Sequence, residues 1–192
     1  MANQNNAKGT AWESAVRDYL NAALGLVDDD GRFLDIFSAL NVKRAAQEGA
    51  RDVGDVHAAP FVLECKDVAN PAVPKWMKQA RAEAAHAGFP YGVVVHKARW
   101  QSVKRGRVHF GMEAVSGVAA ELGVSATELF IGSFLERVER GTDSTRWYWT
   151  TDVEAFGRLL AEVRAARHLT RGGNPRASRR SNPPEERTDV VQ

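Results

Sequence analysis

The chain contains 192 residues, of which 44% are hydrophobic and 26% are charged. These proportions are ordinary for a soluble globular protein, and the length fits one compact domain with some additional chain. No apolar run approaches the roughly 20 residues that a membrane span needs, and residues 1–10 lack the apolar stretch of a signal peptide. A single cysteine, Cys65, excludes an internal disulfide and zinc sites built from cysteine pairs, so we expect a cytoplasmic protein.

The net charge is only +2, but the charges are unevenly distributed. Residues 164–192 contain seven arginines and three acidic residues, whereas residues 1–163 contain nineteen basic and twenty-one acidic residues. This asymmetry suggests a polyanionic partner, although an Arg-rich tail can also be solvated and have no partner. Because residues 169–192 are rich in Gly, Pro, Ser and Arg, we expect a disordered tail.

The N-terminal part predicts one helix and one strand. Residues 1–8 are polar and are expected to be disordered. Thr10 can cap a helix with an apolar period near 3.6 that ends at Gly25. The segment Phe33–Val42 has enough β-branched and aromatic residues for a strand, and residues 43–50 fit either a helix or a loop.

The next part has a clearer pattern. Two short strands, Val53–His57 and Phe61–Asp67, are expected around a tight turn that contains Pro60. A helix then runs from the proline pair Pro71 and Pro74 to about Ala87, and the apolar run Tyr91–Lys97 is typical of a buried strand.

The remaining pattern is weaker, and it predicts two strands and two helices. The strands are Val108–Met112 and Arg146–Thr150, and the helices are Ala126–Arg140 and Asp152–His168. Together the elements predict an α/β fold in which a central mixed β-sheet is flanked by helices. We place this domain at residues 9–168.

We expect Asp55, Glu64 and Lys66 to form a site in which two carboxylates and one ammonium group lie together. Side chains alternate between the faces of a strand, so Glu64 and Lys66 point the same way, while Cys65 points into the opposite, apolar layer. The residues between Asp55 and Glu64 suffice for a hairpin return that brings the two carboxylates together beside one ammonium group. Asp52 could replace Asp55 if the strand were shifted in phase.

Two carboxylates at this spacing suit Mg²⁺, a hard cation that prefers oxygen ligands, and Mn²⁺ could substitute for it. Such a cation polarises a phosphoryl oxygen and lowers the pKa of a bound water. Lys66 can orient that water and offset developing negative charge. The backbone carbonyl of Cys65 is a further candidate ligand.

Two residues on the expected helices fit the same site. Glu13 lies at the edge of the apolar stripe of the first helix, from which it can reach the metal as a ligand. Gln79 lies on the polar face of the second helix, from which it can hydrogen-bond a metal-bound water or the DNA backbone. Glu13 could instead be a surface glutamate that is favoured there by the helix dipole, with no role in catalysis.

The order of these residues resembles the PD-(D/E)XK nuclease superfamily, and more narrowly the archaeal-type and phage Holliday junction resolvases. The resemblance covers about residues 9–97. It implies a restriction-endonuclease-like core, Mg²⁺-dependent hydrolysis, and often a homodimer that cuts branched DNA. It also implies metal ligation by Asp55 and Glu64, a catalytic Lys66, a helix-borne acid at Glu13 and a supporting amide at Gln79.

Several basic residues are candidates for contacts with DNA phosphates, which would weaken steeply with salt. Lys75 shares the helix face of Gln79, a second group precedes the expected strand at Val108, and a third lies in the tail. They are Lys75, Lys104, Arg105, Arg107, Arg171, Arg176, Arg179 and Arg180.

These observations leave three functions open. The first is an endonuclease that cuts branched DNA such as Holliday junctions. The short form with an Arg-rich tail suits a phage protein that acts in the cytoplasm of the bacterial host. The second is another nuclease with the same core, either an exonuclease or a restriction-like enzyme, because a fold does not fix a substrate. The third is a DNA-binding protein without catalysis.

Overall fold

The computed structural model describes residues 2–45, 52–134, 136–139 and 141–172. The strands are β1 (Lys43–Arg44), β2 (Val56–Ala58), β3 (Phe61–Lys66), β4 (Tyr91–His96), β5 (Arg107–Gly111), β6 (Glu136–Val138) and β7 (Tyr148–Asp152). The α-helices are α1 (Ala2–Ala23), α2 (Val73–Ala87), α3 (Met112–Leu122), α4 (Ala126–Ser133) and α5 (Val153–Gly172), and the 3-10 helices are η1 (Val103–Arg105) and η2 (Ser144–Arg146). No single helix of the described chain is long and apolar enough to cross a membrane, although α3 and α4, bent by 96°, pass that test as a pair.

The strands form one mixed sheet in the order β1-β2-β3-β4-β5-β7-β6. Strands β3 and β4 are parallel, and the other neighbouring pairs are antiparallel. The connection between the parallel strands is α2, as a parallel crossover requires. The predicted mixed sheet flanked by helices is therefore confirmed.

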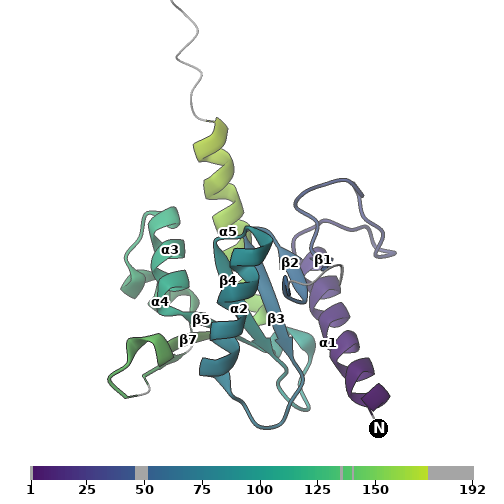
Figure 1. Cartoon of the computed structure of the whole chain (residues 1–192). Helices are drawn as coiled ribbons and strands as arrows, with labels where there is room; N and C mark the ends of the chain where they lie inside the picture. Colours follow the sequence, from purple (N-terminus) through teal and green to yellow (C-terminus); the bar gives the residue numbers. More distant parts are fainter. Residues whose placement is uncertain (1, 46–51, 135, 140, 173–192) are drawn as a thin grey trace, which may run out of the picture.

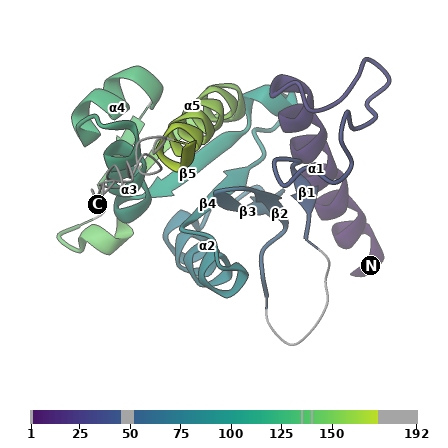
Figure 2. The same cartoon turned by 90° about the horizontal axis from the view of Figure 1, so that it is seen from above.

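Helices cover both faces of the sheet (Figures 1 and 2). Helix α2 lies on one face, where Trp76, Met77 and Ala80 pack on Val94 of β4 and Tyr148 of β7. Helices α1, α3 and α5 lie on the other face, over a larger core that includes Phe61, Phe110 and Phe156. The alternation along each strand thus assigns every side chain to one of two layers.

The middle of the chain follows the sequence prediction closely. Strands β2 and β3 form the expected hairpin, whose turn contains a cis Ala59–Pro60 peptide bond, but β2 begins at Val56 instead of the predicted Val53. Helix α2 has a proline in its first turn and ends at Gly88, which has the left-handed conformation that glycine adopts without strain. Strand β4 occupies the predicted apolar run.

The N-terminal predictions were wrong in two places. Helix α1 starts at Ala2, so residues 2–8 are helical, and Thr10 lies inside the helix; extending an existing helix costs less than nucleating one. The segment Phe33–Val42 forms turns, apart from an isolated bridge between Val27 and Phe33. Its short polar side chains explain this, because Asp35 and Ser38 accept hydrogen bonds from the backbone N–H groups of Phe37 and Leu40.

The C-terminal half departs from prediction at element ends. Helix α4 stops at Ser133 because buried Phe134 turns into the core, edge-on to Phe110 and Trp149, and β6 follows. Helix α3 was not predicted. Helix α5 continues to Gly172, so residues 169–172 are not the disordered tail expected there, and residues 173–192 lie outside the described part.

Candidate active site

The β2–β3 hairpin brings Asp55 next to β3. Asp55 directly precedes β2, and its Oδ2 accepts a hydrogen bond of 2.7 Å from the backbone N–H of Cys65. Gly54 makes this approach possible, because it has a φ of +83° and a Cβ there would lie 2.3 Å from Val62 Cγ1. The Gly-Asp pair is therefore a structural unit that aims one carboxylate at the end of β3.

Glu64 and Lys66 lie on the α2 face of β3, as the strand alternation predicted. Lys66 Nζ donates a hydrogen bond to Glu64 Oε1. Glu64 is only 3% exposed, while the Cys65 side chain points into the apolar core on the other face. The structure thus brings Asp55, Glu64 and Lys66 close together. The carboxyl groups of Asp55 and Glu64 are close enough to Lys66 for its charge to lower both of their pKa values, and Glu64 raises that of Asp55.

Helix α2 adds a carboxyl group that sequence reasoning missed. Glu83 is 1% exposed, contacts the Glu64 carboxyl group, and accepts a 2.7 Å hydrogen bond from Gln79 Nε2. Its other oxygen, Oε2, is buried without a hydrogen-bond partner among the described residues. Gln79 therefore reaches the site, but through Glu83.

Glu13 reaches the other side of the site from α1. Arg44 of β1 holds its Oε2 through Nε at 3.0 Å and Nη2 at 2.6 Å, and Glu13 still raises the pKa of Asp55 electrostatically. The helix thus delivers the predicted acid close to Asp55. Arg44 was not predicted, because its pairing depends on the short strand β1, which sequence patterns did not reveal.

The carboxyl groups crowd one another in a poorly solvated place. Burial raises the pKa of Asp55 to about 7, and the Glu64 carboxylate adds to the rise. Burial also raises the pKa of Glu64 to about 7 against the hydrogen bond from Lys66, with Glu83 raising it further. The pKa of Glu83 is raised by burial as well. Clustered carboxyl groups with such shifts occur at functional sites more often than elsewhere.

Lys66 is the cation of this cluster. Burial alone would lower its pKa, but the hydrogen bond to Glu64 and the charges of Asp55 and Glu83 raise it overall. Lys66 is therefore protonated at neutral pH. Through its contact with Glu64, it partly balances the excess of carboxyl groups.

The donor set suits a hard divalent cation, although it is not arranged as a finished metal site. Carboxylate oxygens are the preferred ligands of Mg²⁺, and the buried Oε2 of Glu83 has no hydrogen-bond partner among the described residues. No group of three or more His, Cys, Asp or Glu within the described chain has metal-binding geometry. A cation shared by Asp55 and Glu64 would need Lys66 to turn away from Glu64. The Cys65 carbonyl as a ligand stays a prediction.

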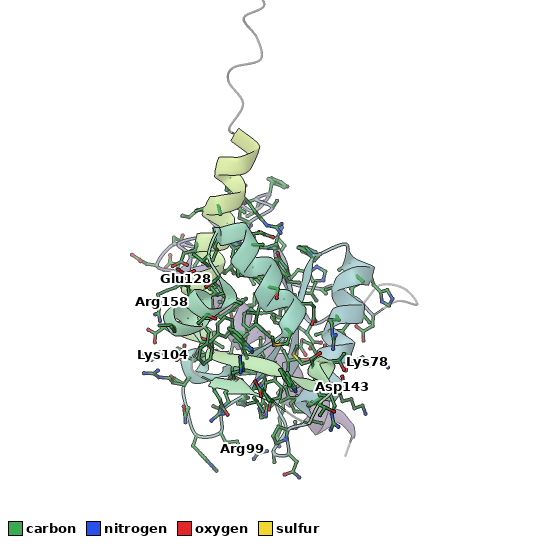
Figure 3. All side chains as sticks on the ribbon, turned by 90° about the vertical axis from the view of Figure 1, so that its left-hand side faces the viewer. Lys78, Arg99, Lys104, Glu128, Asp143 and Arg158 are labelled. Atoms are coloured by element: carbon green, nitrogen blue, oxygen red, sulfur yellow. The ribbon has the colours of Figure 1, made fainter. Side chains whose placement is uncertain are left out.

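The basic candidates for DNA contacts lie in different places. Lys75 is exposed near the start of α2, and Lys104 is exposed in η1, where Figure 3 shows it on the opposite side of the molecule from Lys78. Arg105 pairs with Asp152 at 3.0 Å and Arg107 with Glu136 at 3.8 Å. Arg171 lies in α5, and the remaining three arginines, Arg176, Arg179 and Arg180, lie outside the described residues.

Glu83 carried a signal that sequence reasoning misread. It lies between the apolar positions Ala80 and Ala84 and four residues after Gln79, which predicts contact with both the sheet and Gln79. The sequence pattern places Glu83 on the same polar helix face as Gln79, where a charged residue is seldom fully buried. The exception is itself informative, because a buried carboxyl group indicates a partner such as a proton or a cation.

Comparisons of the chain with protein families, with curated proteins and with solved structures found no match.

Proposed function

We propose that the chain is a Mg²⁺-dependent DNA endonuclease of the PD-(D/E)XK type, with a restriction-endonuclease-like core, that cuts branched DNA such as Holliday junctions. One observation carries the proposal: the β2–β3 hairpin sets Asp55 beside Glu64 and Lys66 on the face that α2 covers. Two acids and a lysine at the end of neighbouring strands form the constellation that the sequence pattern predicted from its chemistry.

Each group has a role in phosphodiester hydrolysis. Asp55 and Glu64 would hold Mg²⁺, with Glu13 and Glu83 close enough to share its charge. A bound Mg²⁺ supplies a Lewis acid for the phosphoryl oxygen and acidifies a water molecule. Once freed from Glu64, Lys66 Nζ can orient the attacking water and offset charge on the phosphate. Gln79 fixes the carboxyl group of Glu83 through its 2.7 Å hydrogen bond.

The burial of the carboxyl groups supports this reading over a purely structural one. Buried carboxylates are costly unless they are paired or bind a metal, and Lys66 is the cation that touches Glu64 in the described chain. A structural cluster would gain from having fewer acids. We infer that the unfavourable excess persists because a cation offsets it during catalysis.

The test is a cleavage assay on a labelled four-way junction, a linear duplex and a single strand, with Mg²⁺ or Mn²⁺. Glu64→Ala and Lys66→Ala are compared with two matched control variants at exposed positions, Glu162→Ala and Lys78→Ala. We expect paired symmetric cuts on the junction, lost by at least about 100-fold in the first two variants and kept in the controls.

Other outcomes would change specific parts of the proposal. Equal cutting of the linear duplex, still lost in Glu64→Ala, would keep the nuclease and overturn the preference for branched DNA. A ladder from one end would indicate an exonuclease. DNA binding without cleavage in either metal would indicate a silent DNA-binding protein. Cleavage that survives both substitutions would overturn the site.

A further inference from the structure

A groove with a volume of about 750 Å³ lies beside the candidate active site on the same face of the sheet. The strand register fixes this placement. Lys66 of β3 pairs with His96 of β4, His96 with Arg107 of β5, and Arg107 with Asp152 of β7, so these four residues form a row across the sheet. The last three line the groove. Because neighbouring strands are about 4.8 Å apart, Arg107 is only ~10 Å from Lys66 along this row.

The floor of the groove is aromatic. The His109 ring meets Tyr148 edge-on at 5.3 Å and lies 6.2 Å from the His96 ring. Burial lowers the pKa of His109 to about 3, so its imidazole is neutral at physiological pH. Its Nδ1 faces Thr150 Oγ1 at 2.9 Å, and its Nε2 has no partner within the described part of the chain. His109 and Tyr148 are only 4% and 6% exposed, so they form the packed bottom of the groove, and His96 is the partly exposed ring above them.

The rim of the groove is basic. Four basic side chains and two acidic ones line it: Lys97, Arg99, Arg105 and Arg107, with Glu136 and Asp152. Asp67, Asp152 and Glu136 pair with Lys97, Arg105 and Arg107 respectively. Arg99 has no ion pair with any described residue, and Figure 3 shows it at the end of the molecule beyond the strands. Arg99 is thus free to meet an anion from outside.

Trp100 stands next to this rim and is fully exposed. Its relative exposure is 100%, and its φ of 62° is unfavourable for a residue other than glycine. Its neighbours Arg99 and Gln101 both line the groove. A large aromatic ring held in water on a strained backbone gains nothing for the fold, whereas it offers a stacking platform to an unpaired base.

We propose that this groove binds a single-stranded DNA segment, with a base stacked on the exposed ring of Trp100 and with phosphates held by Arg99 and the basic rim. A recess that is ~10 Å from Lys66 suits unpaired nucleotides, because the bases of an intact duplex are not free to enter it. The groove would select substrates that expose unpaired nucleotides near the cut, such as a branch with a single-stranded arm. Its link to cleavage rests on the proposed nuclease function, whereas strand binding does not.

The test is fluorescence anisotropy with a dye-labelled thymidine oligonucleotide and a hairpin duplex of equal length, in EDTA so that no cleavage occurs. Trp100→Ala is compared with Trp100→Phe and with Phe37→Ala, which removes another exposed aromatic outside the groove. Arg99→Ala is compared with Arg158→Ala on α5, across the sheet. Circular dichroism checks that each variant is folded.

We expect Trp100→Ala to weaken binding of the single strand about tenfold, with less than a twofold change for the duplex. Trp100→Phe should retain most of the affinity, Arg99→Ala should lower it, and both control variants should bind like the parent chain. Single-strand binding that is unchanged in Trp100→Ala and Arg99→Ala would overturn the groove. Equal losses for single strand and duplex would overturn its selectivity.

The outcome is separable from that of the cleavage assay. If Glu64→Ala still binds single-stranded DNA but neither it nor the parent chain cuts DNA, the proposed groove is supported and the proposed nuclease function is wrong. If the parent chain cuts DNA and Trp100→Ala binds and cuts DNA normally, the nuclease function is supported and the proposed groove is wrong.

Discussion

At the scale of residues, the carboxyl groups of Asp55 and Glu64 connect stability to pH. Their pKa values rise from 3.8 and 4.5 to about 7 on folding, so the folded state binds more protons between these values than the unfolded state. The ionisation of the two carboxyl groups therefore leaves the free energy of unfolding unchanged below about pH 4 and lowers it progressively as the pH rises through about 7. A divalent cation at this place should reverse that loss.

Glu64→Gln should remove much of this dependence. In EDTA, we expect the free energy of unfolding of the parent chain to fall relative to that of the variant between pH 5 and pH 8, measured by urea denaturation. Mg²⁺ should raise the stability of the parent more at pH 8 than at pH 5, and should leave the variant unchanged. Parallel pH profiles for the two proteins would contradict the raised pKa of Glu64.

Glu83 gives a second prediction at this scale. Glu83→Gln keeps the shape of the side chain but removes a charge beside Glu64, and we expect at least a tenfold loss of Mg²⁺-dependent cleavage, with the fold retained. Glu162→Gln, on the exposed side of α5, is the matched control. Because the variant loses a buried carboxyl group, its stability at pH 8 should not fall. Full activity in Glu83→Gln would remove Glu83 from the site.

At the scale of elements, the β2–β3 hairpin depends on Gly54. Gly54→Ala combines a φ of +83° with an overlap on Val62 Cγ1, whereas Gly31→Ala has a similar φ of +77° and meets no atom within 4 Å. We expect Gly31→Ala to lose about 1 kcal/mol of stability and Gly54→Ala about 3 kcal/mol, by urea denaturation. Equal losses would show that backbone strain alone limits this position.

Elements whose turns and ends are marked by proline or glycine were predictable from the sequence. Pro60 marks the turn of the hairpin, a proline pair marks the start of α2, and Gly88 marks its end. The spacing of apolar residues in these elements agrees with the faces that they bury. The strand prediction for Phe33–Val42 was wrong because local hydrogen bonds to the Asp35 and Ser38 side chains outcompeted its strand propensity. The end of α4 failed because burial of Phe134, a tertiary effect, decides it.

The candidate site was predictable to the same degree. Asp55, Glu64 and Lys66 follow from strand alternation and one short hairpin, so their meeting required only local geometry. Arg44 joins the site by pairing with Glu13 through β1, which no local pattern encodes. Glu83 lies between apolar positions of α2, but its contact with Glu64 depends on how α2 packs on the sheet. Long-range contacts of this kind are the part of the site that a single sequence leaves open.

At the scale of the whole molecule, paired cuts on a four-way junction need two active sites, and we expect a homodimer to supply them. Mixed dimers of the parent chain and Glu64→Ala should then nick one strand of the junction in each binding event. Mixtures of the parent chain with Lys78→Ala should keep paired cuts. Nicking and paired cutting are read from a supercoiled plasmid that carries an extruded cruciform. Paired cuts by mixed dimers would show that one subunit cuts both strands.

The strand order carries a consequence for how the molecule assembles. Each strand from β2 to β5 pairs with the strand made just before it, so this part of the sheet can grow in the direction of synthesis. The acids that crowd together lie between Glu13 and Glu83, on elements that precede β4. A chain emerging from the ribosome can therefore bring them together early, and only β6 must wait for β7 to take its place at the edge.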